Sequence, residues 1–221
     1  MGVLPLTGAS TKDWRVTSGD RFAWDVYTLP DAQASFAPGV VVIDIGCGNG
    51  KELKRLTEDG CVAIGLDVDA SALADCRRAN LPVVLAPAEH MPLREQAFDG
   101  LICNVAIPYT DESQVMQEIG RVLKRGARAY LCYHGFGYFL RYVVAGPSFR
   151  MRFYGVRSMV NTWYYRLTGS RLSGFWGDTL YQTHSQLLKY YRRDGLELVE
   201  SRTGKKFLGL PVFIYHLVER L

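Results

Sequence analysis

The sequence has little of what marks membrane-spanning, secreted or metal-binding proteins. No stretch of its 221 residues approaches the roughly 18 consecutive apolar residues of a transmembrane helix. Its N-terminus lacks the basic segment and long apolar run of a signal peptide. The cysteines number five and show no CxxC or other metal-ligand spacing. We therefore expect a cytoplasmic protein with reduced, mostly buried thiols and no metal site.

The composition lacks any extreme that would exclude a globular fold. Apolar residues make up 48% of the chain and charged residues 22%, as in ordinary globular proteins. No internal repeat or low-complexity segment divides the sequence. We expect residues 1–221 to form one domain, long enough to bury a substantial core.

The most informative segment is the glycine-rich stretch at residues 41–50. An apolar run from Val40 to Ile43 ends in Asp44, and glycines follow at positions 46, 48 and 50. Such a run predicts a strand buried on both faces, and glycines after it let the backbone lie against a ligand. A helix expected from Lys51 to Glu58 would point its free N–H groups into the turn. The pattern indicates a nucleotide-type cofactor site.

The details of the turn decide between cofactors. No Gly-Lys-Ser/Thr follows it, which excludes a P-loop, and the glycine spacing differs from the dinucleotide G-x-G-x-x-G fingerprint. A second apolar run, Val62 to Leu66, ends in Asp67. Together these residues resemble the first motif, D-x-G-x-G-x-G, of the class I S-adenosylmethionine-dependent methyltransferases. The plainer interpretation is a tight turn that Asp44 merely caps.

The rest of the chain alternates apolar strand runs with helical patterns, which indicates an α/β fold with a parallel sheet. Ala88-Glu89, Met91-Pro92 and Phe98-Asp99 extend the resemblance to the family. It implies a Rossmann-like, seven-stranded, mostly parallel sheet with helices on both faces and an antiparallel last strand. A helical cap inserted after strand five is expected in addition. A helix from Gln114 to Leu123 is expected to end at a C-cap glycine, Gly126.

The resemblance implies S-adenosyl-L-methionine as cofactor and S-adenosyl-L-homocysteine as product. Asp67 can accept hydrogen bonds from both ribose hydroxyls, and Asp44 would lie near the amino group of the methionine part. Pro87 stands where the family often has an acid that contacts adenine, so Glu89 or the backbone near Ala88 would replace it. The cofactor-binding residues expected are Asp44, Gly46, Cys47, Gly48, Gly50, Asp67, Val68, Ala88, Glu89 and Asn104.

Two residues are candidates for the chemistry on the substrate. Ligands of open α/β sheets bind at the carboxyl ends of the strands. His134 follows the fifth strand and is the expected base or orienting group, and Tyr109 follows the fourth and is expected to line the pocket. A hydrogen-bonded histidine that finishes a strand is an equally good interpretation, as is a tyrosine that only packs.

Residues 135–177 form an aromatic and basic insertion without any acid or lysine. We expect helices there that cap the site, with aromatic side chains inside and arginines outside, above a small apolar or aromatic substrate. Binding of single-stranded nucleic acid, docking on a membrane surface and a dimer interface are alternatives. Residues 1–39 are expected to form an N-terminal lid in which Tyr27 or Trp14 reaches the pocket.

The sequence therefore predicts an S-adenosylmethionine-dependent methyltransferase acting on oxygen or nitrogen of a small apolar or aromatic metabolite. An RNA methyltransferase is the alternative enzyme. A cofactor-binding scaffold or regulator without catalysis is the alternative of another class. Peripheral membrane contact is compatible with each of them.

Overall fold

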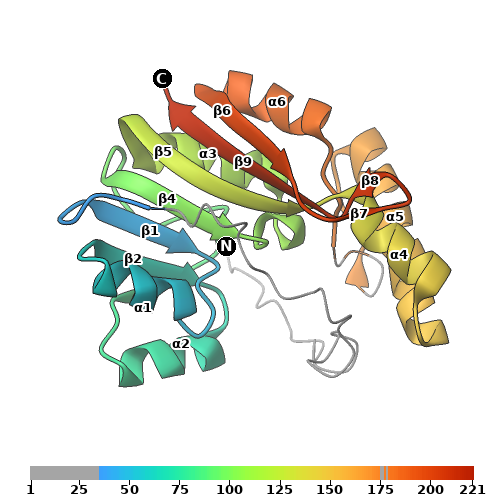
Figure 1. Ribbon diagram of the computed structural model, residues 1–221, viewed down its shortest axis with the longest axis horizontal. Helices are drawn as coiled ribbons and strands as arrows, with labels where there is room; N and C mark the ends of the chain where they lie inside the picture. The colour runs from blue at the N-terminus through green and yellow to red at the C-terminus, as the bar shows by residue number, and fades with distance from the viewer. Residues whose placement is uncertain (1–34, 175–176, 178) are drawn as a thin grey trace, which may run out of the picture.

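The central element of the computed structural model is a seven-stranded sheet, and the residues described are 35–174, 177 and 179–221 (Figure 1). Its strand order is β3-β2-β1-β4-β5-β9-β6, with β9 antiparallel to both neighbours and the other pairs parallel. The strands are β1 (Val41–Ile45), β2 (Val62–Asp67), β3 (Val83–Leu85), β4 (Phe98–Asn104), β5 (Leu123–His134), β6 (Leu196–Thr203) and β9 (Phe213–Arg220). The expected Rossmann-like fold is confirmed.

Helices cover the sheet and extend beyond one end of it (Figure 1). Those near the sheet are α1 (Lys51–Glu58), α2 (Ala70–Arg78), α3 (Glu112–Val122) and α6 (His184–Arg193). Two helices, α4 (Phe136–Ala145) and α5 (Phe149–Thr168), follow β5 within the insertion. They project from the edge where β4 and β5 finish (Figure 1). A short turn η3 (Ile107–Tyr109) and a small hairpin of β7 (Lys206–Phe207) and β8 (Leu210–Pro211) complete the elements, and the sequence had predicted neither.

The largest hydrophobic cluster lies between the sheet and the helices α3 and α6. It is built from side chains such as Ile43, Leu101, Ile119 and Leu187, all of them 0% exposed. A second cluster joins the end of β5 to α4 and α5 through Cys132, Tyr138, Phe139, Tyr142 and Met151. The five cysteines are all buried and free. The insertion is therefore packed onto the sheet edge through its own aromatic core.

The junction between α3 and β5 differs from the expectation. The helix ends at Val122 and Leu123 already begins the strand, so the expected C-cap at Gly126 is wrong. The backbone N–H groups of Gln96 and Ala97 donate to the carbonyl oxygens of Arg121 and Val122 at 2.9 Å each. These donors satisfy carbonyls at the helix end, so no glycine cap is needed.

Little of the expected N-terminal lid falls within the described residues. Phe36 lies edge-on to Tyr130, with ring centroids 5.5 Å apart, and its ring fills the space beside Gly100. Tyr27 and Trp14 lie outside the described residues. Over the part that the structure describes, no helix is both long and apolar enough to span a membrane.

Candidate functional site

The register of the sheet brings three of the predicted residues to one edge. Ile45 pairs with Leu66 on one side and with Cys103 on the other. Gly46, Asp67 and Asn104 are the next residues of their three strands, so they are neighbours at the carboxyl edge. The strand order changes direction between β1 and β4, and open α/β sheets bind ligands at such a switch point.

The turn after β1 has the backbone geometry that glycine allows. Gly46 has φ +75°, and a methyl group there would overlap the side chain of Ala106. Gly48 has φ +53°, yet a methyl group there would meet no atom within 4 Å. Packing thus accounts for Gly46, whereas the space in front of Gly48 is open to a ligand. Gly50 caps α1, whose N-terminus faces the turn.

Asp67 closes the turn from the neighbouring strand. Its Oδ2 accepts a hydrogen bond from the Gly48 N–H at 2.8 Å, and its Oδ1 accepts one from Asp69 at 2.9 Å. The side chain is half-buried, so part of the carboxylate stays accessible. Val68 beside it is 67% exposed. Cys47, in contrast, is buried with its thiol against Gly65 and offers a ligand only its backbone.

Negative charge accumulates under the turn. Asp44 is 2% exposed, and burial raises the pKa of its carboxyl from 3.8 to about 7. Repulsion by Glu52 and then Asp67 adds to the increase, and Arg55 opposes it. A cation placed near this carboxyl would lower the pKa again, because an opposite charge favours the ionised form. The site is therefore suited to a ligand with a positive group.

The end of β4 supplies a polar atom without a partner. The Oδ1 atom of Asn104 is buried and accepts no hydrogen bond from any described residue. The next residue, Val105, is buried with φ +62°, a backbone conformation that β-branched residues avoid at a cost of about 1–2 kcal/mol. The sequence pattern contains no sign of this strain. Both features mark the position beside Gly46 as shaped for a ligand.

The loop after β3 is braced from α3. Glu118 accepts a hydrogen bond from the Met91 N–H at 2.7 Å, and Arg121 donates to the carbonyl oxygens of Met91 and Leu93. Ala88 is buried in this loop. Glu89 accepts a hydrogen bond from the Asp111 N–H at 2.9 Å, so one of its oxygens already supports the start of α3.

His134 ends β5 inside an aromatic shell. Its ring is 0% exposed and stacks on Tyr138 with centroids 3.7 Å apart. Neither ring nitrogen has a hydrogen-bond partner among the described residues. Burial and then the positive charge of Arg141 hold the pKa of His134 well below its usual range. Both effects favour the neutral imidazole.

Tyr109 lies at the surface beside this shell. It is 48% exposed, and its ring centroid is 6.0 Å from that of His134 in an edge-on arrangement. The turn η3 carries it directly after β4. The structure thus brings the two residues predicted for the substrate side together, next to the end of the strand that carries Asn104.

The expectation of an insertion that is aromatic inside and basic outside holds only in part: Tyr138, Phe139 and Tyr142 are buried and Arg150 and Arg166 are exposed, but other residues of the insertion depart from it. Arg141 is 0% exposed and lies over the rings of Tyr138 and Tyr142, and Arg157 is 1% exposed. Large aromatic side chains stand outside instead, with Phe149 84% and Trp163 64% exposed. The guanidinium groups are buried because tyrosine rings on the same helices stabilise them by cation–π contact.

A buried polar group on the opposite side of β5 was also missed. Glu112 is 3% exposed and accepts hydrogen bonds from Gln182 and Tyr190, each at 3.1 Å. Burial raises the pKa of this carboxyl. The three side chains tie α3 to α6 and to the segment before it. An acid at the start of an amphipathic helix gives no signal of such a role in the sequence.

Comparison with known proteins agrees with this geometry. A family model described as "Methyltransferase domain" matches residues 43–131, from β1 to β5. The matched residues contain the glycine turn, Asp67, the braced loop and Asn104. The region from β1 to β5 is therefore similar to a methyltransferase domain, and the fold around it is that of S-adenosylmethionine-dependent methyltransferases.

Relatives in sequence match less than half of this chain. Protein MJ1252 of Methanocaldococcus jannaschii, described as uncharacterized, is 35% identical over 94 residues, which are 42% of this chain and 36% of that protein. The tRNA (carboxymethyluridine(34)-5-O)-methyltransferase alkbh8 of Xenopus tropicalis is 34% identical over 107 residues, 47% of this chain and 17% of that protein. The match thus spans about a third of these relatives or less.

Solved structures show the same fold over most of the chain. A methyltransferase from Mesorhizobium loti has a TM-score of 0.63 at 18% identity, covering 83% of this chain and 92% of its own. The 1,6-didemethyltoxoflavin-N1-methyltransferase of Burkholderia thailandensis has a TM-score of 0.56 at 15% identity, covering 83% and 72%. That structure holds 1,6-didemethyltoxoflavin and S-adenosylhomocysteine.

Proposed function

We propose that the protein binds S-adenosylmethionine at the carboxyl edge of β1, β2 and β4 and methylates an oxygen or nitrogen of a small apolar or aromatic molecule. The cofactor supplies an electrophilic methyl group on a sulfonium centre. Three observations support its placement: the open space before Gly48, the accessible carboxylate of Asp67 and the unpartnered Oδ1 of Asn104.

The described residues divide the task of holding the cofactor. Asp67 would accept hydrogen bonds from the vicinal ribose hydroxyls, each contributing about 1.5–3 kcal/mol. Asp44, with Glu52 nearby, would stabilise the positive charge of the methionine part. The Oδ1 of Asn104 would accept a hydrogen bond from the same part. Ala88 and the braced loop would form the wall beside the adenine.

The aromatic shell around His134 is the single observation that carries the substrate class. Tyr138, Phe139 and Phe213 surround the ring with centroid distances of 3.7, 5.6 and 5.9 Å. Such a shell suits a flat or apolar molecule that displaces water, and two free imidazole nitrogens can orient one polar group on it. Holding the acceptor in line with the methyl group can supply about 7–11 kcal/mol of the barrier.

On this proposal residues 135–177 cap the substrate, and His134 orients it. A neutral imidazole with a depressed pKa is a weak base, so positioning is the larger part of its contribution. Tyr109 would line the entrance. All three assignments concern the carboxyl ends of β4 and β5, where the two candidate residues meet.

The test has two steps. Calorimetric titration with S-adenosylmethionine and S-adenosylhomocysteine should give micromolar dissociation constants, and NADH should give no binding. Transfer of a labelled methyl group is then followed against panels of phenols, amines and carboxylic acids. Absence of binding by either sulfur nucleoside would refute the cofactor site. Binding without turnover on any panel would favour a regulatory scaffold.

An RNA substrate is the second candidate, because a relative named as a tRNA methyltransferase shares 34% identity over 107 residues. Arg141 and Arg157 are buried and are unable to contact phosphates at the surface, so only exposed arginines such as Arg150 and Arg166 would serve this function. Phosphate contacts would make substrate binding fall steeply with salt. An affinity for tRNA that is unchanged from low to moderate salt would therefore speak against contacts with the phosphates of the RNA. Methylation of tRNA by the purified protein would establish an RNA substrate.

A further inference from the structure

The long helix α5 carries several large apolar residues on its exposed face. The face packed against the protein carries small or polar residues, including Gly155, Ser158 and Thr162. The hydroxyl groups of Ser158 and Thr162 form hydrogen bonds within the helix. Ser158 donates to Tyr154 O at 3.0 Å, and Thr162 donates to Ser158 O at 2.8 Å. Asn161 is also buried and donates to Thr179 O at 3.2 Å. Of the large apolar residues of this helix, only Met151 and Tyr165 are buried on the inner face.

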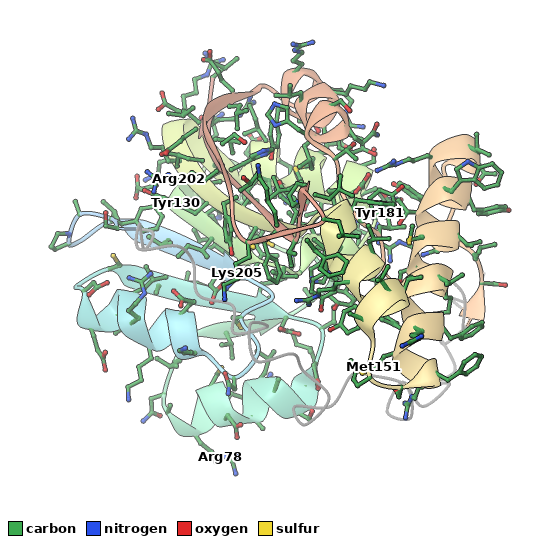
Figure 2. The ribbon with its side chains drawn as sticks, turned by 45° about the vertical axis from the view of Figure 1, so that its right-hand side comes forward. Arg78, Tyr130, Met151, Tyr181, Arg202 and Lys205 are labelled. Carbon is green, nitrogen blue, oxygen red and sulfur yellow. The ribbon has the colours of Figure 1, made fainter. Side chains whose placement is uncertain are left out.

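A set of regularly spaced apolar residues lines the outer face of α5. Exposed fractions are 84% for Phe149, 42% each for Val156 and Val160, 64% for Trp163 and 66% for Leu167. With Phe153, which stacks on Phe149, they recur at alternating intervals of four and three residues, so they form one continuous stripe. Over the 20 residues of α5 such a stripe is about 30 Å long. Side chains on this side of α5 point away from the molecule (Figure 2).

The charges beside the stripe are of one sign. Arg150, Arg152 and Arg166 are exposed and flank it, Arg166 lying over the ring of Tyr181 at 4.5 Å. No acidic residue and no lysine occurs between positions 135 and 177. An apolar stripe with aromatic residues between arginines is the pattern of a helix that lies in the interface of a lipid bilayer.

We propose that α5 docks the protein on an anionic membrane surface, with the stripe from Phe149 to Leu167 in the headgroup region and the flanking arginines on lipid phosphates. Charge complementarity selects this occupant. A second copy of α5 on the same stripe would bring arginines against arginines, because the helix carries no acid to pair with them. The helix would lie on the bilayer without crossing it, consistent with its polar inner face.

Vesicle sedimentation of the full chain tests the proposal. We expect binding to vesicles that contain phosphatidylglycerol and about tenfold weaker binding to phosphatidylcholine alone. The variant Phe149→Ser/Trp163→Ser should lose about tenfold in vesicle affinity, because it removes the largest exposed apolar groups. A matched control, Val199→Ser/Leu221→Ser, removes side chains that are 49% and 60% exposed in β6 and directly after β9, and this variant should bind as the parent does.

A charge variant separates the two contributions. Arg150→Glu/Arg166→Glu should abolish the preference for phosphatidylglycerol and leave the weak binding to phosphatidylcholine. Equal affinity of parent and stripe variant for anionic vesicles would overturn the proposal. So would a dimer in solution that the stripe variant converts to a monomer, since a second copy would then cover the stripe. If the full chain does not bind vesicles and a variant without residues 1–34 does, the occupant of the stripe would be that segment and the proposal would be overturned. Affinity for S-adenosylhomocysteine should be equal in all variants, because the glycine turn lies on other elements.

Discussion

The carboxylate of Asp67 and the backbone N–H of Gly48 are joined by a hydrogen bond of 2.8 Å, which links the end of β2 to the glycine turn after β1. The bond holds the glycine turn beside Asn104, the last residue of β4. One carboxylate thereby has two tasks, because the oxygen that holds the turn belongs to the same group that would receive the ribose.

Asp67→Ala tests the second task. We expect the affinity for S-adenosylhomocysteine to fall at least about tenfold, since charge-assisted hydrogen bonds of about 1.5–3 kcal/mol are removed. Isothermal titration calorimetry measures the change. Asp75→Ala serves as the control, because this acid lies on the exposed side of α2 and pairs only with Arg78 among the described residues. Unchanged affinity in a folded Asp67→Ala variant would refute the ribose assignment.

Asp44→Asn should stabilise the protein at neutral pH. The folded-state pKa of Asp44 is raised from 3.8 to about 7. The free energy of unfolding that depends on its protonated form is therefore fully present below pH 3.8 and is lost as the pH rises to about 7. At about 1.4 kcal/mol per pH unit, the difference corresponds to at most about 4 kcal/mol. Urea unfolding at pH 5 and pH 8 measures it.

The comparison of the two pH values supplies the control. The advantage of Asp44→Asn in free energy of unfolding should be larger at pH 8 than at pH 5. A constant advantage would mean that Asp44 does not titrate in this range. The same substitution should weaken the binding of S-adenosylmethionine, because the positively charged ligand loses the negative charge that faces it.

Asn104→Ala should reduce ligand affinity with little effect on stability. Its buried Oδ1 has no partner within the described chain, so we expect the free energy of unfolding to change by less than about 1 kcal/mol. Asn161→Ala is the matched control. Asn161 donates to Thr179 O at 3.2 Å and accepts from Leu172 N–H at 3.0 Å, so its loss should cost about 1–3 kcal/mol. Equal costs for both variants would show that Asn104 is a structural residue.

His134→Ala should lower kcat at least about tenfold and change the affinity for S-adenosylhomocysteine less than twofold. His134→Gln should recover part of the rate, because an amide can also orient a polar group. The parent kcat should show no step near pH 6.5 from this residue, since burial lowers its pKa well below that usual value. A rate that follows a pKa near 6.5 and loses that dependence in His134→Ala would instead show a general base.

The fold could be predicted well because its signals are local. The run from Val40 to Ile43, the glycine spacing and the alternation of strands with helices predicted a mostly parallel sheet with helices on it, and α1 begins and ends at the predicted residues. The neighbourhood of Asp44, Gly48 and Asp67 followed from strand ends in a parallel sheet. Such features need no knowledge of distant contacts.

The insertion could not be predicted in the same way. Whether Arg141 is buried depends on rings of α4 that stack over it, and whether Trp163 is exposed depends on which face of α5 meets the protein. The helical period gave two faces but not their assignment, since the composition favoured burying the aromatic one. The φ of Val105 likewise results from packing after β4 and is absent from any local pattern.

The passage from α3 into β5 is followed by an irregular stretch from Leu123 to Arg128, after which β5 pairs regularly with β4 and β9. One residue inserted beyond Arg128 would turn each following side chain of the strand to the other face, so Tyr133 would take the place of His134. Insertions and engineered tags should therefore be placed outside this strand. The turn between β7 and β8, where Leu208 is 72% exposed, can lengthen freely.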